Sequence, residues 1–168
     1  MKTKPLIIGV GNPLRHDDGI GPQIIKILRS MQEGSSPYNR QQGNKNSNIV
    51  DCKDLTLFDG GTDGLALLDQ VAEYEKVIII DAVQMLAPPG TVKSFTPAEA
   101  KINIKSDVLS THGFGLADML KLAEKLDIKT KISIIGIQPK DISFGEGLSN
   151  EVQTQIPLIL DLIKQTNM

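Results

Sequence analysis

The stretch that decides the fold is residues 6–24, which read LIIGVGNPLRHDDGIGPQI. Its first five residues form a nearly unbroken apolar run that ends at Gly11, Asn12 and Pro13. Such a run is typical of a strand that is buried on both faces. The next apolar positions recur at helical spacing, and Pro22 is acceptable in the first turn of a helix. The stretch therefore predicts a buried strand that leads directly into a helix.

The rest of the chain repeats this alternation. Apolar patterns predict a second strand from 49–50 and 55–58, interrupted near 53–54, and further strands at 77–80, 91–95 and 131–137. They also predict helices around 65–72, 116–123 and 156–163. The connection before 91–95 is too short for a helical crossover, so this strand is expected to run antiparallel at an edge. The order predicts a three-layer, doubly wound α/β fold: a mostly parallel five-stranded sheet with one antiparallel edge strand and helices on both faces.

Length and composition indicate a single globular domain. The chain has 168 residues, of which 40% are hydrophobic and 23% charged, and its net charge is -2. We predict one domain over residues 1–168. Residues 34–48 contain no aliphatic side chain that could be buried, so this polar segment is predicted to be a mobile surface loop.

Several partners and compartments are excluded or favoured by the same composition. The sequence contains no stripe of Lys and Arg with interleaved aromatic residues, so it gives no indication of nucleic-acid binding. The apolar run near the N-terminus is too short for a signal peptide or a membrane span. The single cysteine, Cys52, excludes an internal disulfide and a multi-cysteine zinc site within one chain. We therefore expect a cytoplasmic protein without nucleic acid or membrane as partners. We also expect it to act as a monomer.

Acidic side chains lie where the ligand crevice of a doubly wound fold is expected, just after the carboxyl ends of the strands. Asp17 and Asp18 follow the first strand, and Asp81 follows 77–80. Two carboxylates would repel a pyrophosphate, and the glycines do not complete a dinucleotide fingerprint, so nucleotide binding is disfavoured. Together with His112, which precedes a predicted helix, Asp18 and Asp81 could bind a divalent metal. The alternatives are helix capping and ordinary hydrogen bonding to the backbone.

Other catalytic arrangements are missing from the sequence. It has no GxSxG elbow, no HExxH helix and no cysteine–histidine signature around Cys52. Cys52 is expected to be a core residue, and the aspartates do not form the paired motifs of pepsin-like enzymes.

Five blocks together resemble the hydrogenase maturation protease family. They are GVGNPLRHDDGIG (9–21), DGGT (59–62), VIIIDAV (77–83), STHGFGLADML (110–120) and GIQP (136–139). In that family the second of two adjacent acidic residues, an aspartate at the end of the third strand and a histidine before the third helix bind a metal. This metal marks where the nickel of the substrate docks. The resemblance implies that Asp18, Asp81 and His112 are the metal-binding and catalytic residues, with Asp17 capping a helix. Two features depart from the family pattern: the polar insertion before the second strand, and His16 next to Asp17 and Asp18.

The resemblance also implies the activity and the partner. The protein would be a nickel-dependent endopeptidase, of the aspartyl type, that removes the C-terminal extension of a [NiFe]-hydrogenase large-subunit precursor after nickel insertion. The nickel would be supplied by the substrate. Asp59, Gly60, Gly61 and Thr62 would help to select the large subunit, and Thr62 is also a candidate N-cap of the following helix.

Two mechanisms and two other functions stay open at this stage. Hydrolysis could be driven by the metal as a Lewis acid or by a carboxylate acting as a general base. A metallochaperone or scaffold that binds the nickel-loaded subunit without cutting it is the main alternative function. A nucleotide-binding or nucleoside-binding enzyme on a similar sheet is the other.

Overall fold

The computed structural model describes residues 1–36, 52–103 and 115–167. The strands are β1 (Leu6–Val10), β2 (Thr56–Gly61), β3 (Lys76–Ala82), β4 (Val92–Phe95) and β5 (Lys131–Ile137). The α-helices are α1 (Ile20–Gln32), α2 (Gly64–Ala72), α3 (Pro97–Asn103), α4 (Leu116–Lys125), α5 (Asn150–Gln153) and α6 (Ile156–Asn167). Two short 3-10 helices are η1 (His16–Gly19) and η3 (Cys52–Asp54).

The five strands form one sheet in the order β2-β1-β3-β5-β4. β1 pairs in parallel with β2 and with β3, and β3 pairs in parallel with β5. β4 lies at the edge and runs antiparallel to β5. The predicted fold class and the antiparallel edge strand are confirmed. The winding changes direction between β1 and β3, so a crevice is expected beyond the carboxyl ends of these two strands.

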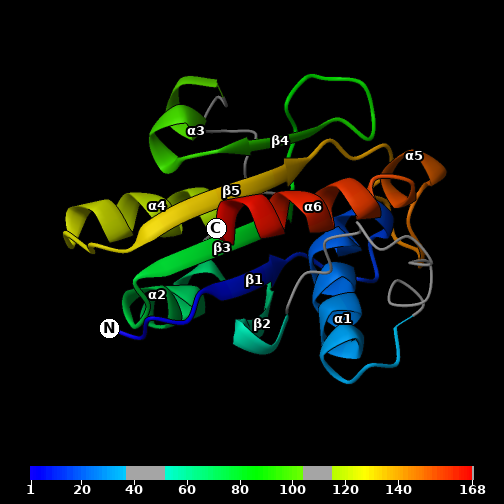
Figure 1. The fold of residues 1–168 in the computed structure, drawn as a ribbon. Helices are drawn as coiled ribbons and strands as arrows, with labels where there is room; N and C mark the ends of the chain where they lie inside the picture. The colour runs from blue at the N-terminus through cyan, green and yellow to red at the C-terminus, as the bar shows by residue number, and fades with distance from the viewer. Residues whose placement is uncertain (37–51, 104–114, 168) are drawn as a thin grey trace.

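Helices cover both faces of the sheet, as Figure 1 shows with α1 and α6 on one side and α2 and α4 on the other. Alternate residues of each inner strand point to opposite faces, so each strand contributes to two cores. Ile7, Ile78 and Ile135 pack with α1 and α6 on one face. Ile8 and Ile79 pack with α2 and α4 on the other. The inner strands are apolar at nearly every position because both of their faces are buried.

The first turn of α1 lies directly against the sheet. A Cβ atom at Gly21 would be 2.6 Å from the Val10 nitrogen and 2.7 Å from the Ile80 carbonyl oxygen. Real Cβ atoms essentially never come so close, so only glycine allows this packing. Because η1 immediately precedes α1, the close approach also fixes the position of Asp17 and Asp18 relative to β3.

The structure differs from the sequence prediction at several element boundaries. β2 extends to Gly61, whereas the strand was predicted to stop before Asp59. Cys52 is buried as predicted but lies in η3 and not in a strand. The short helices α3 and α5 were not predicted. Of the predicted loop at 34–48, Ser36 is buried and residues 37–48 lie outside the described part of the chain.

Candidate active site

Asp18 and Asp81 meet at the carboxyl edge of β1 and β3. Asp18 lies in η1, which follows β1, and Asp81 is the last but one residue of β3. The two side chains are close enough for the charge of Asp18 to act on the Asp81 carboxyl. Two of the three predicted metal ligands are thus at the same place, which is the switch point of the sheet.

The Asp18 carboxylate is oriented by the loop that follows β1. The backbone nitrogen of Asn12 donates a hydrogen bond of 2.9 Å to Asp18 Oδ2. Gly11 has a φ of 131°, a conformation that L side chains rarely adopt, and a Cβ there would collide with the Asp18 carbonyl oxygen. The GxG of the sequence therefore allows the loop to fold back onto Asp18, where a nucleotide site would use it to approach a phosphate.

Asp81 is buried, with 6% of its surface exposed. Burial, together with the nearby charge of Asp18, raises the pKa of Asp81 well above its ordinary value, while a backbone hydrogen bond from Ala82 acts in the opposite direction. A buried carboxyl beside a second carboxylate is an unfavourable arrangement for a purely structural side chain. Such perturbed carboxyls cluster at functional sites.

His112, the third predicted ligand, lies outside the described residues. Within the described ranges, no group of three or more His, Cys, Asp or Glu side chains is arranged to hold a metal ion. The described part of the site consists of the Asp18–Asp81 pair.

Asp17 does not cap a helix, and this prediction is wrong. Its carboxylate is fully buried and accepts four hydrogen bonds from the segment after β5. The donors are the backbone nitrogens of Lys140 (2.8 Å), Asp141 (3.1 Å) and Ser149 (2.6 Å) and the Ser149 hydroxyl (2.8 Å). No side chain caps η1 or α1. Because its partners are distant in sequence, Asp17 joins the loop after β1 to the loop after β5.

His16 and Gln138 also join loops at the carboxyl edge of the sheet through their side chains. His16 Nδ1 lies 3.1 Å from the Gly147 carbonyl oxygen, so the ring contacts the loop after β5. Gln138 is buried, and its side-chain oxygen accepts a hydrogen bond of 2.7 Å from the Met85 nitrogen in the loop after β3. Its amide nitrogen donates to Gln84 Oε1 at 2.8 Å. Sequence reasoning gave Gln138 no role, although the GIQP block that contains it was the available signal.

Residues 59–62, which the resemblance implies for substrate selection, lie beside the loop that carries Asp18. Asp59, Gly60 and Gly61 end the edge strand β2, and Thr62 follows it. The Gly11 nitrogen donates a hydrogen bond of 2.8 Å to the Gly61 carbonyl oxygen, which connects this segment to the loop that carries Asp18. Asp63, and not Thr62, is the N-cap of α2, accepting from the Leu65 and Ala66 nitrogens.

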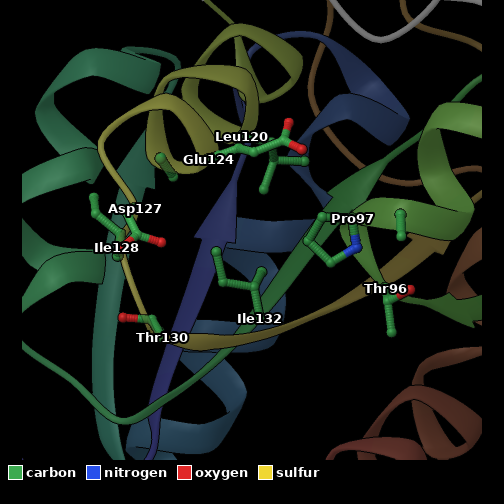
Figure 2. Close-up of a pocket in the computed structure, with 10 residues that line it drawn as sticks. Thr96, Pro97, Leu120, Glu124, Asp127, Ile128, Thr130 and Ile132 are labelled. Atoms are coloured by element: carbon green, nitrogen blue, oxygen red, sulfur yellow. The ribbon is translucent and has the colours of Figure 1, made fainter.

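A pocket of about 360 Å³ lies elsewhere, between α3, α4 and the start of β5. Figure 2 shows Ile132 between the α4 residues and Thr96 and Pro97. Asp81 is paired with Gly136, four residues further along β5 than Ile132, which corresponds to about 13 Å along the strand. The residues that line the pocket are Thr96, Pro97, Ala98, Leu120, Ala123, Glu124, Asp127, Ile128, Thr130 and Ile132. The pocket is therefore separate from the acidic pair.

Fold and site together define a doubly wound α/β protein with paired carboxylates at its switch point. The hydrogenase maturation protease family model matches residues 42–166. The delta subunit of the coenzyme F420 hydrogenase from Methanothermobacter thermautotrophicus is 30% identical over 165 residues, which cover 94% of this chain and 90% of that protein. Hydrogenase expression/formation protein HupD from Thiocapsa roseopersicina is 28% identical over 166 residues, covering 96% of this chain and 67% of that protein.

Solved structures agree with these relatives. The [NiFe] hydrogenase maturation protease HybD from Thermococcus kodakarensis superimposes with a TM-score of 0.72 at 28% identity, covering 99% of this chain and 100% of that one. The chain therefore belongs to the hydrogenase maturation protease family, and it is an endopeptidase. The resemblance noted in the sequence is confirmed. Within the described residues, no helix has both the length and the apolar character needed to cross a membrane.

Proposed function

We propose that this endopeptidase removes the C-terminal extension of a [NiFe]-hydrogenase large-subunit precursor after nickel has been inserted. The observation that carries the proposal is the convergence of Asp18 and Asp81 at the switch point of the sheet. In this proposal the nickel belongs to the substrate. It docks on Asp18, Asp81 and His112, and the docking brings the scissile peptide bond to the same place.

The charges of the described pair favour a cation. Two neighbouring carboxylates, one of them buried, repel each other, and a divalent cation between them would offset that repulsion. The Asn12 nitrogen uses part of the acceptor capacity of Asp18 Oδ2, and a carboxylate has about four lone-pair positions, so Asp18 can still accept a metal. Carboxylate and imidazole ligands bind many divalent ions, so selection of nickel must come from the substrate.

Two roles in hydrolysis are open to the acidic pair. In the first, Asp18 and Asp81 hold the substrate nickel, which acts as a Lewis acid toward the peptide carbonyl. In the second, one of the carboxylates accepts a proton from the attacking water as a general base. Burial and the charge of Asp18 raise the pKa of Asp81, which makes its ionised form a stronger base than an ordinary carboxylate.

The position of residues 59–62 is consistent with a role in recognising the same substrate. These residues are joined to the loop of the acidic pair through the hydrogen bond between Gly11 and Gly61. Asp59 and Thr62 are exposed and could contact a docked subunit. We propose that these residues select the large subunit, and that the enzyme acts as a monomer, since one chain supplies both carboxylates. The cytoplasmic location expected from the sequence stays a prediction.

The test is a mass measurement of precursor incubated with the purified protein. Nickel-loaded precursor should lose its C-terminal extension, whereas nickel-free precursor should stay intact. Asp81→Asn and Asp18→Asn should abolish cleavage, because each removes a charge from the pair. Asp127→Asn is the matched control: it makes the same chemical change at an exposed residue after α4, and cleavage should be retained.

Each outcome distinguishes the candidate functions. Equal cleavage of nickel-free precursor would show that nickel does not select the substrate. Full activity in Asp81→Asn would remove this residue from the site. Tight binding of nickel-loaded precursor without any cleavage would instead support the metallochaperone or scaffold.

A further inference from the structure

The loop that follows β5, residues 139–149, displays an aromatic side chain at the edge that carries the acidic pair. Phe144 is 82% exposed, although burying an aromatic ring against other apolar groups is energetically favourable. A single exposed apolar side chain needs no explanation. Here, however, a second one lies beside it: Leu14 is 54% exposed, and its carbonyl oxygen accepts a hydrogen bond of 2.9 Å from the Gly145 nitrogen.

The fold holds this loop firmly in place. The four hydrogen bonds to the buried Asp17 carboxylate attach both ends of the loop, at residues 140–141 and at Ser149. The His16 nitrogen donates to the Gly145 carbonyl oxygen at 2.9 Å. Hydrogen bonds to a buried charged group are among the strong ones in proteins. Phe144 is therefore exposed on a fixed platform and not on a free loop.

Arg15 fixes the Phe144 ring from one side. Its guanidinium carbon lies 5.4 Å from the ring centroid, within the range of a cation–π contact. Its Nε atom donates a hydrogen bond of 3.0 Å to the Ile142 carbonyl oxygen, which keeps the guanidinium near the loop. The guanidinium contacts one face of the ring, and the exposure of the side chain leaves most of its surface for another molecule.

This platform lies close to the reaction site. Arg15 precedes Asp18 by three residues, so their Cα atoms are separated by at most about 11 Å. The same Arg15 contacts the Phe144 ring. A polypeptide whose scissile bond lies at Asp18 would reach the ring within a few residues.

We propose that Phe144 is a specificity-determining residue that binds an apolar side chain of the precursor close to the bond that is cut. The ring offers apolar surface and no strong hydrogen-bonding group, and the Arg15 cation on one face would repel a second cation, so the complementary group is apolar. The inference rests on the proposed function, because it takes the hydrogenase large-subunit precursor as the substrate. Asp17 is the positioning residue that keeps the platform next to Asp18.

The experiment measures both binding and cleavage of the nickel-loaded precursor by Phe144→Ala and Phe144→Leu. Phe144→Ala should raise the dissociation constant and the KM by about tenfold, because the contact buries much of an aromatic side chain. The kcat and the thermal midpoint should be unchanged, since the exposed ring stabilises neither the fold nor the reacting atoms. Phe144→Leu should recover most of the affinity. The control is Leu126→Ala, which removes an exposed apolar side chain at the end of α4.

The outcomes separate this inference from the proposed function. Unchanged binding in Phe144→Ala, or an equal loss in Leu126→Ala, would overturn the role of Phe144. A fall in kcat at unchanged affinity would do the same. If the wild type binds the precursor without cutting it, the proposed function fails while the dissociation constants still judge Phe144. A wild type that does not bind the precursor overturns both.

Discussion

Asp81 is a carboxyl group in a place where its charge is poorly stabilised. Its folded pKa is raised by burial and by Asp18, above the ordinary value it takes in the unfolded chain. Between these two pKa values the folded state binds a proton that the unfolded state has lost. The stability contributed by the protonated group is therefore lost as pH rises through this window, starting near 3.8. The residue is a cost to the fold, and the role proposed for it in docking nickel would account for that cost.

We expect Asp81→Asn to stabilise the nickel-free protein at neutral pH, because the amide nearly keeps the shape and removes the buried charge. Its stability should also fall less than that of the wild type as pH rises from 4 toward 8. Thermal unfolding at several pH values measures this, with Asp127→Asn as the exposed control. A variant that is less stable than the wild type at pH 8 would show that Asp81 is bonded in a way that favours its charge.

Asp17 is the opposite case, a buried carboxylate that the structure satisfies fully. An asparagine would replace one acceptor oxygen by a donor facing other donors, which leaves buried groups unpaired. We expect Asp17→Asn to lower the free energy of unfolding by about 1–3 kcal/mol. Denaturant unfolding measures the loss. Asp63→Asn is the comparison, since asparagine caps a helix as well as aspartate does and should cost almost nothing. Equal effects of the two would show that the four hydrogen bonds to Asp17 contribute no more stability than a helix cap does.

At the level of elements, the contact between α1 and the sheet positions the site. Gly21→Ala would place a Cβ against Val10 and Ile80, so the start of α1 must move away from β1 and β3. We expect a loss of stability of about 1–3 kcal/mol or more and a strong reduction in cleavage, because Asp18 would move relative to Asp81.

The control for this change is Gly34→Ala at the other end of α1. Gly34 has a φ of 74° and no atom near its virtual Cβ, so alanine there should cost only the backbone strain, about 1 kcal/mol. Cleavage, measured at a temperature where both variants are folded, should stay normal in Gly34→Ala. Reduced cleavage in both variants alike would show that lost stability, and not displacement of Asp18, is responsible.

The elements that the sequence predicted well are those with long apolar patterns. β1 and β5 were predicted with their observed bounds, because β1 is buried at every position and β5 is buried from Ile134 to Ile137. The short helix α3 was missed, although Thr96 and Glu99 form reciprocal hydrogen bonds at its start and the TPAE letters carry that capping signal. The role of Asp17 could not be predicted, because its partners lie more than 120 residues away in the sequence.

At the level of the whole molecule, the two ends of the sheet have different properties. The carboxyl edge holds Asp18, Asp81, residues 59–62 and the loop of Phe144. Asp17 and Gln138 bond the loops after β1, β3 and β5 to one another, and Gly11 bonds residues 59–62 to the loop after β1. The pocket near Ile132 lies toward the amino end of β5. Its two acidic side chains, Glu124 and Asp127, could suggest a second candidate for the active site, so the two ends can be tested against each other.

We expect the double variant Glu124→Gln, Asp127→Asn to cleave nickel-loaded precursor within about twofold of the wild-type rate. The pocket is separated from Asp81 by about 13 Å along the sheet, and exposed substitutions change energies by about 0.5 kcal/mol or less. Asp81→Asn, which also removes negative charge, should be inactive in the same assay. The measurement is the time course of extension release by mass spectrometry, with thermal unfolding to verify that both variants are folded. A large loss of cleavage in the double variant, with Asp81→Asn active, would move the catalytic site to the pocket at the opposite end of the sheet.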